Sequence, residues 1–138
     1  MKSTWWIGAA GAVLLTATSA AQTGGRAALD KANKELAERQ RSLMSTLRAV
    51  LVDRLKDPAS AQFRREFLSA SDGEPEVISL CGEVNSRNSY GGYVGFGGFI
   101  VTGERLVIVE QQEPAGAFEA IWQTWCAKPV AKPAVPAK

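Results

Sequence analysis

The side chains best suited to binding chemistry lie in residues 81–100. Between Tyr90 and Phe99 an aromatic residue recurs at every third position, and five glycines separate these aromatics. Glycine lets a backbone approach a partner closely, and tyrosine is favoured at binding surfaces because its ring is apolar and its hydroxyl forms hydrogen bonds. The candidate binding residues of this loop, 85–98, are Asn85, Arg87, Asn88, Tyr90, Gly91, Gly92, Tyr93 and Phe96. A structural alternative stays open, since aromatics opposite glycines also pack within twisted sheets and Asn and Gly form turns.

Catalytic chemistry has less support, because the 138-residue chain contains no histidine. Its absence removes the usual general base at neutral pH, the Ser-His-Asp and Cys-His arrangements, and most zinc sites. The glycine-rich segment is not a P-loop, which would end in Lys-Ser/Thr, and a hairpin follows it where a dinucleotide fingerprint would need a helix. We therefore predict no catalytic residue, no metal site and no cofactor.

One enzymatic alternative remains, a small carboxylate-dependent hydrolase of envelope polysaccharide. Glu83, Glu104 and Glu110 could supply the pair of carboxylates that glycoside hydrolysis uses. This alternative requires one of the three to sit in a cleft with a raised pKa.

The two cysteines, Cys81 and Cys126, are predicted to form one disulfide. They form a pair without a leftover thiol, and no CxxC spacing or histidine favours a redox or metal site. Closing a loop of about 46 residues would stabilise the fold by roughly 4 kcal/mol through the unfolded-state entropy.

The N-terminus has the layout of a secretory signal peptide, residues 1–21. Lys2 precedes an apolar run from Trp5 to Leu15, and small residues follow at 18–21. The run is shorter than the roughly 20 residues of a membrane-spanning helix, so no transmembrane anchor is expected after cleavage. These features predict a periplasmic or secreted protein.

Length and charge limit the remaining functions. Cleavage would leave about 117 residues, enough for one domain. The 16 basic and 14 acidic residues nearly cancel, to a net charge of +2. Such a balance gives little support to nucleic-acid binding.

The elements that must position the loop begin with a helix from Ala27 to Lys56. Its apolar stripe consists of Leu29, Leu36, Leu43, Leu47, Val50, Leu51 and Leu55. The stripe is thin in the first half, so we expect residues 22–56 to form an amphipathic, partly projecting helix that could self-associate. Asp57 is expected to cap a short second helix that starts at Pro58 and runs through about Phe63.

Residues 57–127 are predicted to form a compact α+β domain with an antiparallel sheet of three to four strands. The expected strands are 66–70, 76–85, 96–102 and 105–111, and Gly103-Glu104 is expected to be a two-residue type II′ turn. This turn would pair Val101 with Leu106 and Phe99 with Ile108 on the face that meets the helices.

The C-terminal part contains a helix and a tail. Residues 117–127 carry an apolar stripe of Phe118, Ile121, Trp122 and Trp125, which predicts a helix that the disulfide clamps to the sheet. Residues 128–138 are dominated by Lys, Pro, Val and Ala and are expected to be disordered.

Two segments carry a resemblance to a known group of proteins. Residues 55–63 read LKDPASAQF, and residues 81–85 read CGEVN, followed by Asn88 and by GGYVGF at 91–96. Together they resemble a group of small, largely uncharacterised bacterial proteins that are exported or associated with phages and plasmids. The resemblance implies a bacterial source and an envelope location, and it supplies no activity.

These observations predict an exported, non-enzymatic binding or interaction module that uses the 85–98 loop. Its expected partner is an envelope protein or a glycan. A more specific form of this hypothesis is an inhibitor or immunity-type protein that inserts the loop into the cleft of a cell-wall hydrolase.

Overall fold

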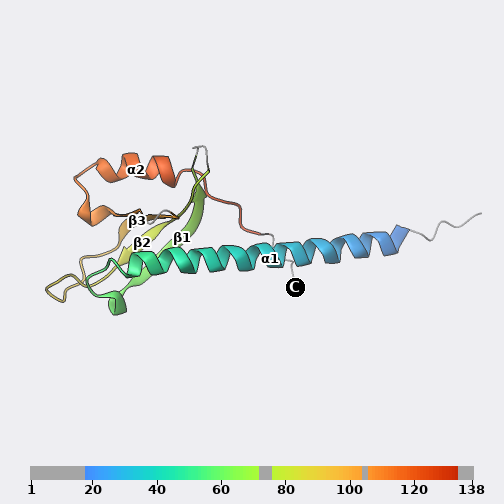
Figure 1. Ribbon diagram of the computed structural model, residues 1–138, viewed down its shortest axis with the longest axis horizontal. Helices are drawn as coiled ribbons and strands as arrows, with labels where there is room; N and C mark the ends of the chain where they lie inside the picture. Colours follow the sequence, from blue (N-terminus) through green and yellow to red (C-terminus); the bar gives the residue numbers. More distant parts are fainter. Residues whose placement is uncertain (1–17, 72–75, 104–105, 134–138) are drawn as a thin grey trace, which may run out of the picture.

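The computed structural model describes residues 18–71, 76–103 and 106–133 (Figure 1). The helices are α1 (Thr18–Val52), α2 (Ala117–Trp125) and two short 3₁₀ helices, η1 (Pro58–Ser60) and η2 (Glu110–Gln112). The strands are β1 (Gln62–Ala70), β2 (Ile78–Asn85), β3 (Gly97–Thr102) and β4 (Val107–Val109), and they form one antiparallel sheet in the order β1-β2-β3-β4. The predicted α+β class, with a C-terminal helix joined to the sheet by a disulfide, is confirmed.

The sheet lies between the two α-helices, α1 and α2 (Figure 1). On the α1 face, Leu47 and Leu51 pack with side chains of all four strands, Phe99 among them. On the α2 face, Phe118 and Cys126 pack with Cys81, Ile100 and Ile108. The Cys81–Cys126 disulfide spans this second cluster, with 6.0 Å between the two Cα atoms.

Helix α1 is longer at its start and shorter at its end than predicted. It is already helical at Thr18, and it ends at Val52, four residues before the expected Lys56. After Val52 the backbone hydrogen bonds span three residues, as in a 3₁₀ helix. The Arg54 N–H donates to the Leu51 carbonyl, and the Leu55 N–H donates to the Val52 carbonyl. The chain turns here because Pro58 disfavours helical geometry at Asp57, whose φ is −130° and ψ is 84°.

The first half of α1 projects from the domain (Figure 1). Side chains from Gly24 to Ala32 are all exposed, and Leu29 and Leu36 are 66% and 45% exposed. The predicted signal peptide lies outside the described residues up to position 17. No helix in the described part of the chain combines the length and apolarity needed to cross a membrane.

The prediction that the Asp57 side chain caps the second helix was wrong. Asp57 holds the N-cap position of η1, but its side chain makes no capping hydrogen bond. Ser60 instead bonds the Asp57 carbonyl oxygen through both its N–H and its hydroxyl, at 3.1 and 2.8 Å. The second helix also ends at Ser60, because the chain enters β1 at Gln62.

The register predicted for the β3–β4 hairpin was wrong by one residue. Val101 pairs with Val107 and Ile100 with Ile108, and the Thr102 N–H bonds the Leu106 carbonyl. Three residues, 103–105, therefore separate the paired ends, where a two-residue turn was expected. Because a slip of one residue exchanges the faces of a strand, Ile108 lies on the α2 side and Leu106 is 44% exposed.

The prediction of disorder from Lys128 onward does not hold for residues 128–131. Lys128 and Val130 exchange backbone hydrogen bonds with Ala70 and Leu68 of β1, at 3.0 and 2.8 Å. Val130 packs against the core cluster on the α1 side. The tail pairs here because β1 is the edge strand of the sheet and offers free backbone groups.

Candidate functional site

The predicted binding loop connects β2 to β3 and extends their hairpin. We call residues 86–96 the Tyr90 loop. Arg87 and Tyr93 form an antiparallel bridge across its base. Beyond that bridge the Asn88 N–H donates to the Gly92 carbonyl at 2.9 Å, and the Gly91 N–H donates to the Asn88 carbonyl at 3.0 Å.

Two asparagine side chains hold the backbone of this loop. The Asn88 side-chain oxygen accepts hydrogen bonds from the N–H groups of Tyr90 and Gly92, at 2.9 and 3.1 Å. Asn85 does the same for the N–H of Gly95, at 3.2 Å. Asparagine suits this role because its short amide can replace a backbone acceptor in a turn. The loop is therefore fixed by its own side chains.

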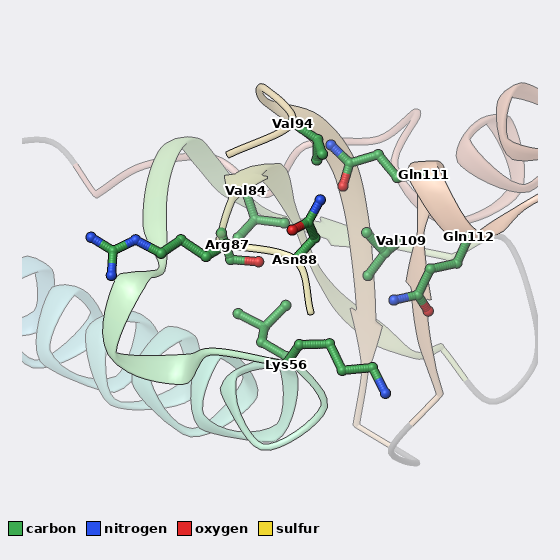
Figure 2. Close-up of a pocket in the computed structure, with 10 residues that line it drawn as sticks. Lys56, Val84, Arg87, Asn88, Val94, Val109, Gln111 and Gln112 are labelled. Carbon is green, nitrogen blue, oxygen red and sulfur yellow. The ribbon is translucent and has the colours of Figure 1, made fainter. Parts of the chain in front are cut away.

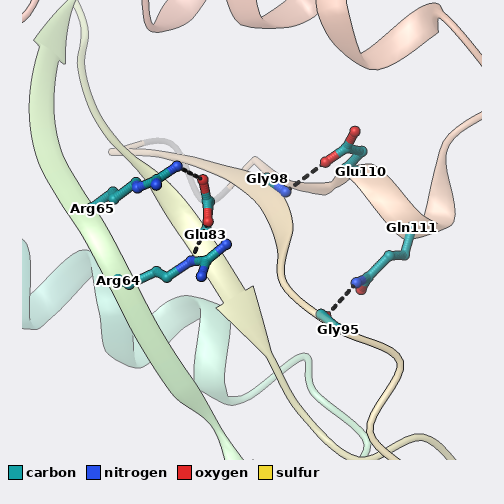
Figure 3. A network of polar contacts seen from close by, with 7 residues as sticks. All are labelled: Arg64, Arg65, Glu83, Gly95, Gly98, Glu110 and Gln111. Carbon is teal, nitrogen blue, oxygen red and sulfur yellow. Dashed lines mark hydrogen bonds and ion pairs between the residues drawn. The ribbon is translucent and has the colours of Figure 1, made fainter.

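Two glycines of the loop are required by its backbone. Gly91 and Gly95 have φ values of +79° and +99°, a region that residues with a Cβ rarely adopt. The Gly95 carbonyl also accepts a hydrogen bond from the Gln111 side chain at 3.0 Å (Figure 3). This bond joins the second arm of the loop to η2.

The two tyrosines of the loop differ in their surroundings. Tyr90 is 96% exposed. Tyr93 is 45% exposed, and its hydroxyl donates to the Ser60 carbonyl of η1 at 3.2 Å. Tyr93 therefore braces the loop, whereas Tyr90 presents its ring to the surroundings.

Arg87 joins the same brace. Its N–H donates to the Ser60 hydroxyl at 2.9 Å, and its guanidinium lies 5.4 Å from the centre of the Tyr93 ring. The guanidinium also pairs with the Asp57 carboxylate at 3.9 Å. Ser60 and Asp57 belong to the LKDPASAQF segment, so the two segments that carry the resemblance contact each other in the fold.

A cavity of about 250 Å³ opens beside the Tyr90 loop (Figure 2). Asn88 and Val94 of the loop line it, together with Lys56 from the turn after α1 and Gln111 from η2. Val84 and Val109 contribute apolar surface. Amide, ammonium and apolar groups thus face a space beside the Tyr90 loop.

Phe96 does not belong to this cavity. The Arg64 guanidinium lies 3.9 Å from the centre of its ring, and Phe96 lines a second cavity together with residues of α2. Of the predicted binding residues, Arg87, Asn88, Tyr90, Gly91, Gly92 and Tyr93 lie in the Tyr90 loop, and Asn85 holds the loop from the end of β2. Phe96, the last residue of the loop, lies at a different surface.

The carboxylates proposed for the enzymatic alternative have separate partners (Figure 3). Glu83 pairs with Arg64 and with Arg65, the latter at 3.0 Å. The hydrogen bond from Arg64 is the main cause that lowers the pKa of Glu83 below its ordinary value. Glu110 accepts a hydrogen bond from the Gly98 N–H at 2.7 Å, and Glu104 lies outside the described residues. The pKa shift of Glu83 is thus opposite to the one that a general acid requires.

Three residues of the site were missed by the sequence analysis. Ser60 and Gln111 support the loop through hydrogen bonds, and Lys56 lines its cavity. Ser60 lies in one of the two segments that carry the resemblance, which was the only signal that linked it to the loop. Lys56 lies in the same segment, whereas no spacing or composition indicated Gln111.

No group of three or more His, Cys, Asp or Glu side chains among the residues described above is arranged to hold a metal ion. Comparison with known proteins gives no match to a family model, to a curated protein or to a solved structure.

Proposed function

We propose that this protein is an exported binding module and that the Tyr90 loop contacts its partner, an envelope protein or a glycan. One observation carries the proposal. Tyr90 is 96% exposed on a loop whose backbone is held by Asn88 at two N–H groups. An exposed apolar ring on an ordered loop has no role in packing the domain.

The energetic argument rests on preorganisation. Ordering a loop or side chain on association costs free energy, and a loop that is already ordered avoids much of that cost. A tyrosine adds a large contact area with few rotatable bonds, so it is an effective anchor in a partner's pocket. The bracing of the loop by Ser60 and Tyr93 supports such a use.

The location outside the cytoplasm rests on two features. The sequence pattern of residues 1–21 is typical of a signal peptide. The Cys81–Cys126 disulfide is of the kind that persists in oxidising compartments.

The experiment is capture of partners by the purified protein from envelope fractions of a bacterium that produces it. Tyr90→Ala should lose the captured partner, whereas Leu106→Ala, which removes another exposed apolar side chain, should keep it. Both variants should retain the stability of the parent protein, because surface substitutions usually change it by less than about 0.5 kcal/mol. Unchanged capture by Tyr90→Ala would contradict the proposal.

The exposed position of Tyr90 also favours the more specific inhibitor hypothesis, in which the loop enters the cleft of a cell-wall hydrolase. Inhibition of a panel of cell-wall hydrolases by the parent protein, lost in Tyr90→Ala, is the expected result. The absence of inhibition across the panel would remove this form of the proposal and leave the general one.

A further inference from the structure

A second candidate site lies on the opposite face of the sheet from α1. A cavity of about 270 Å³, which we call the α2 cavity, is bounded by Phe118, Glu119 and Trp122 of α2. Glu83 of β2, Gly98 of β3 and Glu110 of η2 face it, and Arg64 and Phe96 complete the lining. Figure 3 shows Glu83 and Glu110 on the side of the sheet that α2 covers.

The absence of a side chain at Gly98 is essential to the shape of this cavity. A Cβ atom at Gly98 would lie 2.5 Å from the Phe118 ring, closer than van der Waals contact allows. Phe118 therefore packs directly onto the backbone of β3, and α2 approaches the sheet closely. Gly98 and Phe118 line the cavity together with Phe96 and Trp122.

The polar groups of the α2 cavity are held in place before any ligand binds. Glu83 is fixed by Arg64 and Arg65, and Glu110 is fixed through Oε2 by the Gly98 N–H. The Arg64 guanidinium in turn lies over the Phe96 ring. Fixed carboxylates beside aromatic rings offer two kinds of contact at once: charge-assisted acceptors for hydroxyl groups and apolar surface for a carbon ring.

We propose that the α2 cavity binds one pyranose unit of a glycan. Equatorial hydroxyls would donate to Glu83 and Glu110, and the ring would rest against Trp122. The volume of about 270 Å³ is near the lower end of ligand pockets, which span roughly 300–1,000 Å³, so a single small ring fits better than a larger ligand.

The charges of the lining predict which sugars are accepted. Three carboxylates, of Glu83, Glu110 and Glu119, line the cavity together with the guanidinium of Arg64. The Arg65 guanidinium also pairs with Glu83, so the three carboxylates outnumber the two guanidiniums and the site has a net negative charge. Groups of like charge placed against each other at an interface oppose binding. An amino sugar should therefore bind more tightly than a neutral sugar, and a uronic acid should be excluded.

The test is a titration of the full chain, followed by NMR of the Gly98 amide and the Trp122 indole N–H. The probes are a glucosamine tetramer, cellotetraose, tetragalacturonate and propylamine, which carries the amine without the ring. We expect saturable shifts with the first two, with the glucosamine tetramer roughly tenfold tighter than cellotetraose, and none with tetragalacturonate. Propylamine should bind at least tenfold more weakly than the glucosamine tetramer.

Matched variants make the assignment specific. Glu110→Gln keeps an acceptor for Gly98 but loses the charge, and it should weaken binding of the glucosamine tetramer by roughly tenfold. Glu119→Gln, at an exposed position, should reduce the preference for the amino sugar without affecting folding. Glu76 is an exposed carboxylate outside the cavity, so Glu76→Gln should leave the affinity for each sugar unchanged.

Three results would overturn the proposal. These are the absence of saturable shifts with either favoured sugar, tightest binding by tetragalacturonate, or equal binding by propylamine, which would mean that the cavity recognises charge alone. The proposal concerns a surface other than the Tyr90 loop, so Tyr90→Ala should leave these titrations unchanged. If the sugar-binding proposal fails, the function proposed for the Tyr90 loop is therefore unaffected.

Discussion

The hydroxyl of Tyr93 donates a hydrogen bond to the backbone carbonyl of Ser60, 33 residues earlier in the chain, at 3.2 Å. Ser60 also accepts the Arg87 N–H through its own hydroxyl. A single turn of 3₁₀ helix thus anchors both arms at the base of the Tyr90 loop. The segment after α1 therefore supports the loop in addition to connecting α1 to β1.

The first prediction concerns this anchor. Tyr93→Phe removes one hydroxyl, and it should lower the free energy of unfolding by about 1 kcal/mol, the usual contribution of one hydrogen bond. Tyr90→Phe makes the same chemical change at a side chain that is 96% exposed and should have no measurable effect. Urea denaturation of the two variants provides the comparison. Equal stabilities would show that the Tyr93–Ser60 bond contributes nothing.

The second prediction concerns the close contact of β3 with α2. In Gly98→Ala the new methyl group would lie 2.5 Å from the Phe118 ring, so one of the two must move. Overpacking of this kind usually costs about 1–3 kcal/mol. Gly92→Ala is the matched control, since its Cβ would meet only the Asn88 side-chain oxygen at 3.9 Å. Thermal unfolding of both variants tests the prediction, which fails if Gly98→Ala is as stable as the control.

The third prediction is a dependence of stability on pH. Arg64 and Arg65 lower the folded-state pKa of Glu83 below its ordinary value. The stabilising effect is therefore fully present above the unfolded-state pKa of about 4.3, and it is lost as the pH falls through the lower folded-state pKa. In Glu83→Gln the loss of stability between pH 5 and pH 3 should be smaller than in the parent protein. Parallel pH profiles of the two proteins would refute the assignment.

The disulfide and the C-terminal helix could be predicted from the sequence, because each depends on residue types and spacings within the chain itself. Two cysteines left one pairing, and the stripe from Phe118 to Trp125 fits only a helix with one buried face. The hairpin register was not predictable, because turns of two and three residues both suit a Gly at position 103. That one residue decides which face each side chain of β4 occupies.

The candidate site was predictable as a segment and not in its details. The glycine and tyrosine spacing marked residues 85–98, but Tyr90 and Tyr93 look alike in the sequence. Their different roles come from a contact between Tyr93 and Ser60, which only the tertiary fold creates. The tail was mispredicted for a related reason, since its composition does not reveal that the edge of β1 is free to pair with it.

The fourth prediction concerns the disulfide. Cys81 and Cys126 are both buried, and their bond fixes the end of α2 to β2. In the chain-entropy model, opening a loop of about 46 residues costs roughly 4 kcal/mol of stability. Reduction under mild denaturant, or the Cys81→Ala and Cys126→Ala double variant, should lower the urea midpoint strongly. A midpoint within error of the oxidised protein would contradict this role.

The fifth prediction concerns the projecting half of α1. Leu29 and Leu36 lie seven residues apart on one side of the helix and are 66% and 45% exposed. Most of the stability of a helix in a protein comes from packing of its apolar face, so burial of this stripe against a second copy would stabilise the projecting half. We therefore expect the chain without residues 1–21 to show concentration-dependent self-association in sedimentation velocity.

The variants of this helix separate the stripe from the helix as a whole. Burying a leucine contributes about 1.5–3 kcal/mol, so Leu29→Gln combined with Leu36→Gln should raise the dissociation constant at least roughly tenfold. Ala27→Gln combined with Lys34→Gln changes the opposite side of the helix and should leave association intact. If the parent protein sediments as a monomer at every concentration, the leucine stripe does not mediate self-association and its exposure needs another explanation.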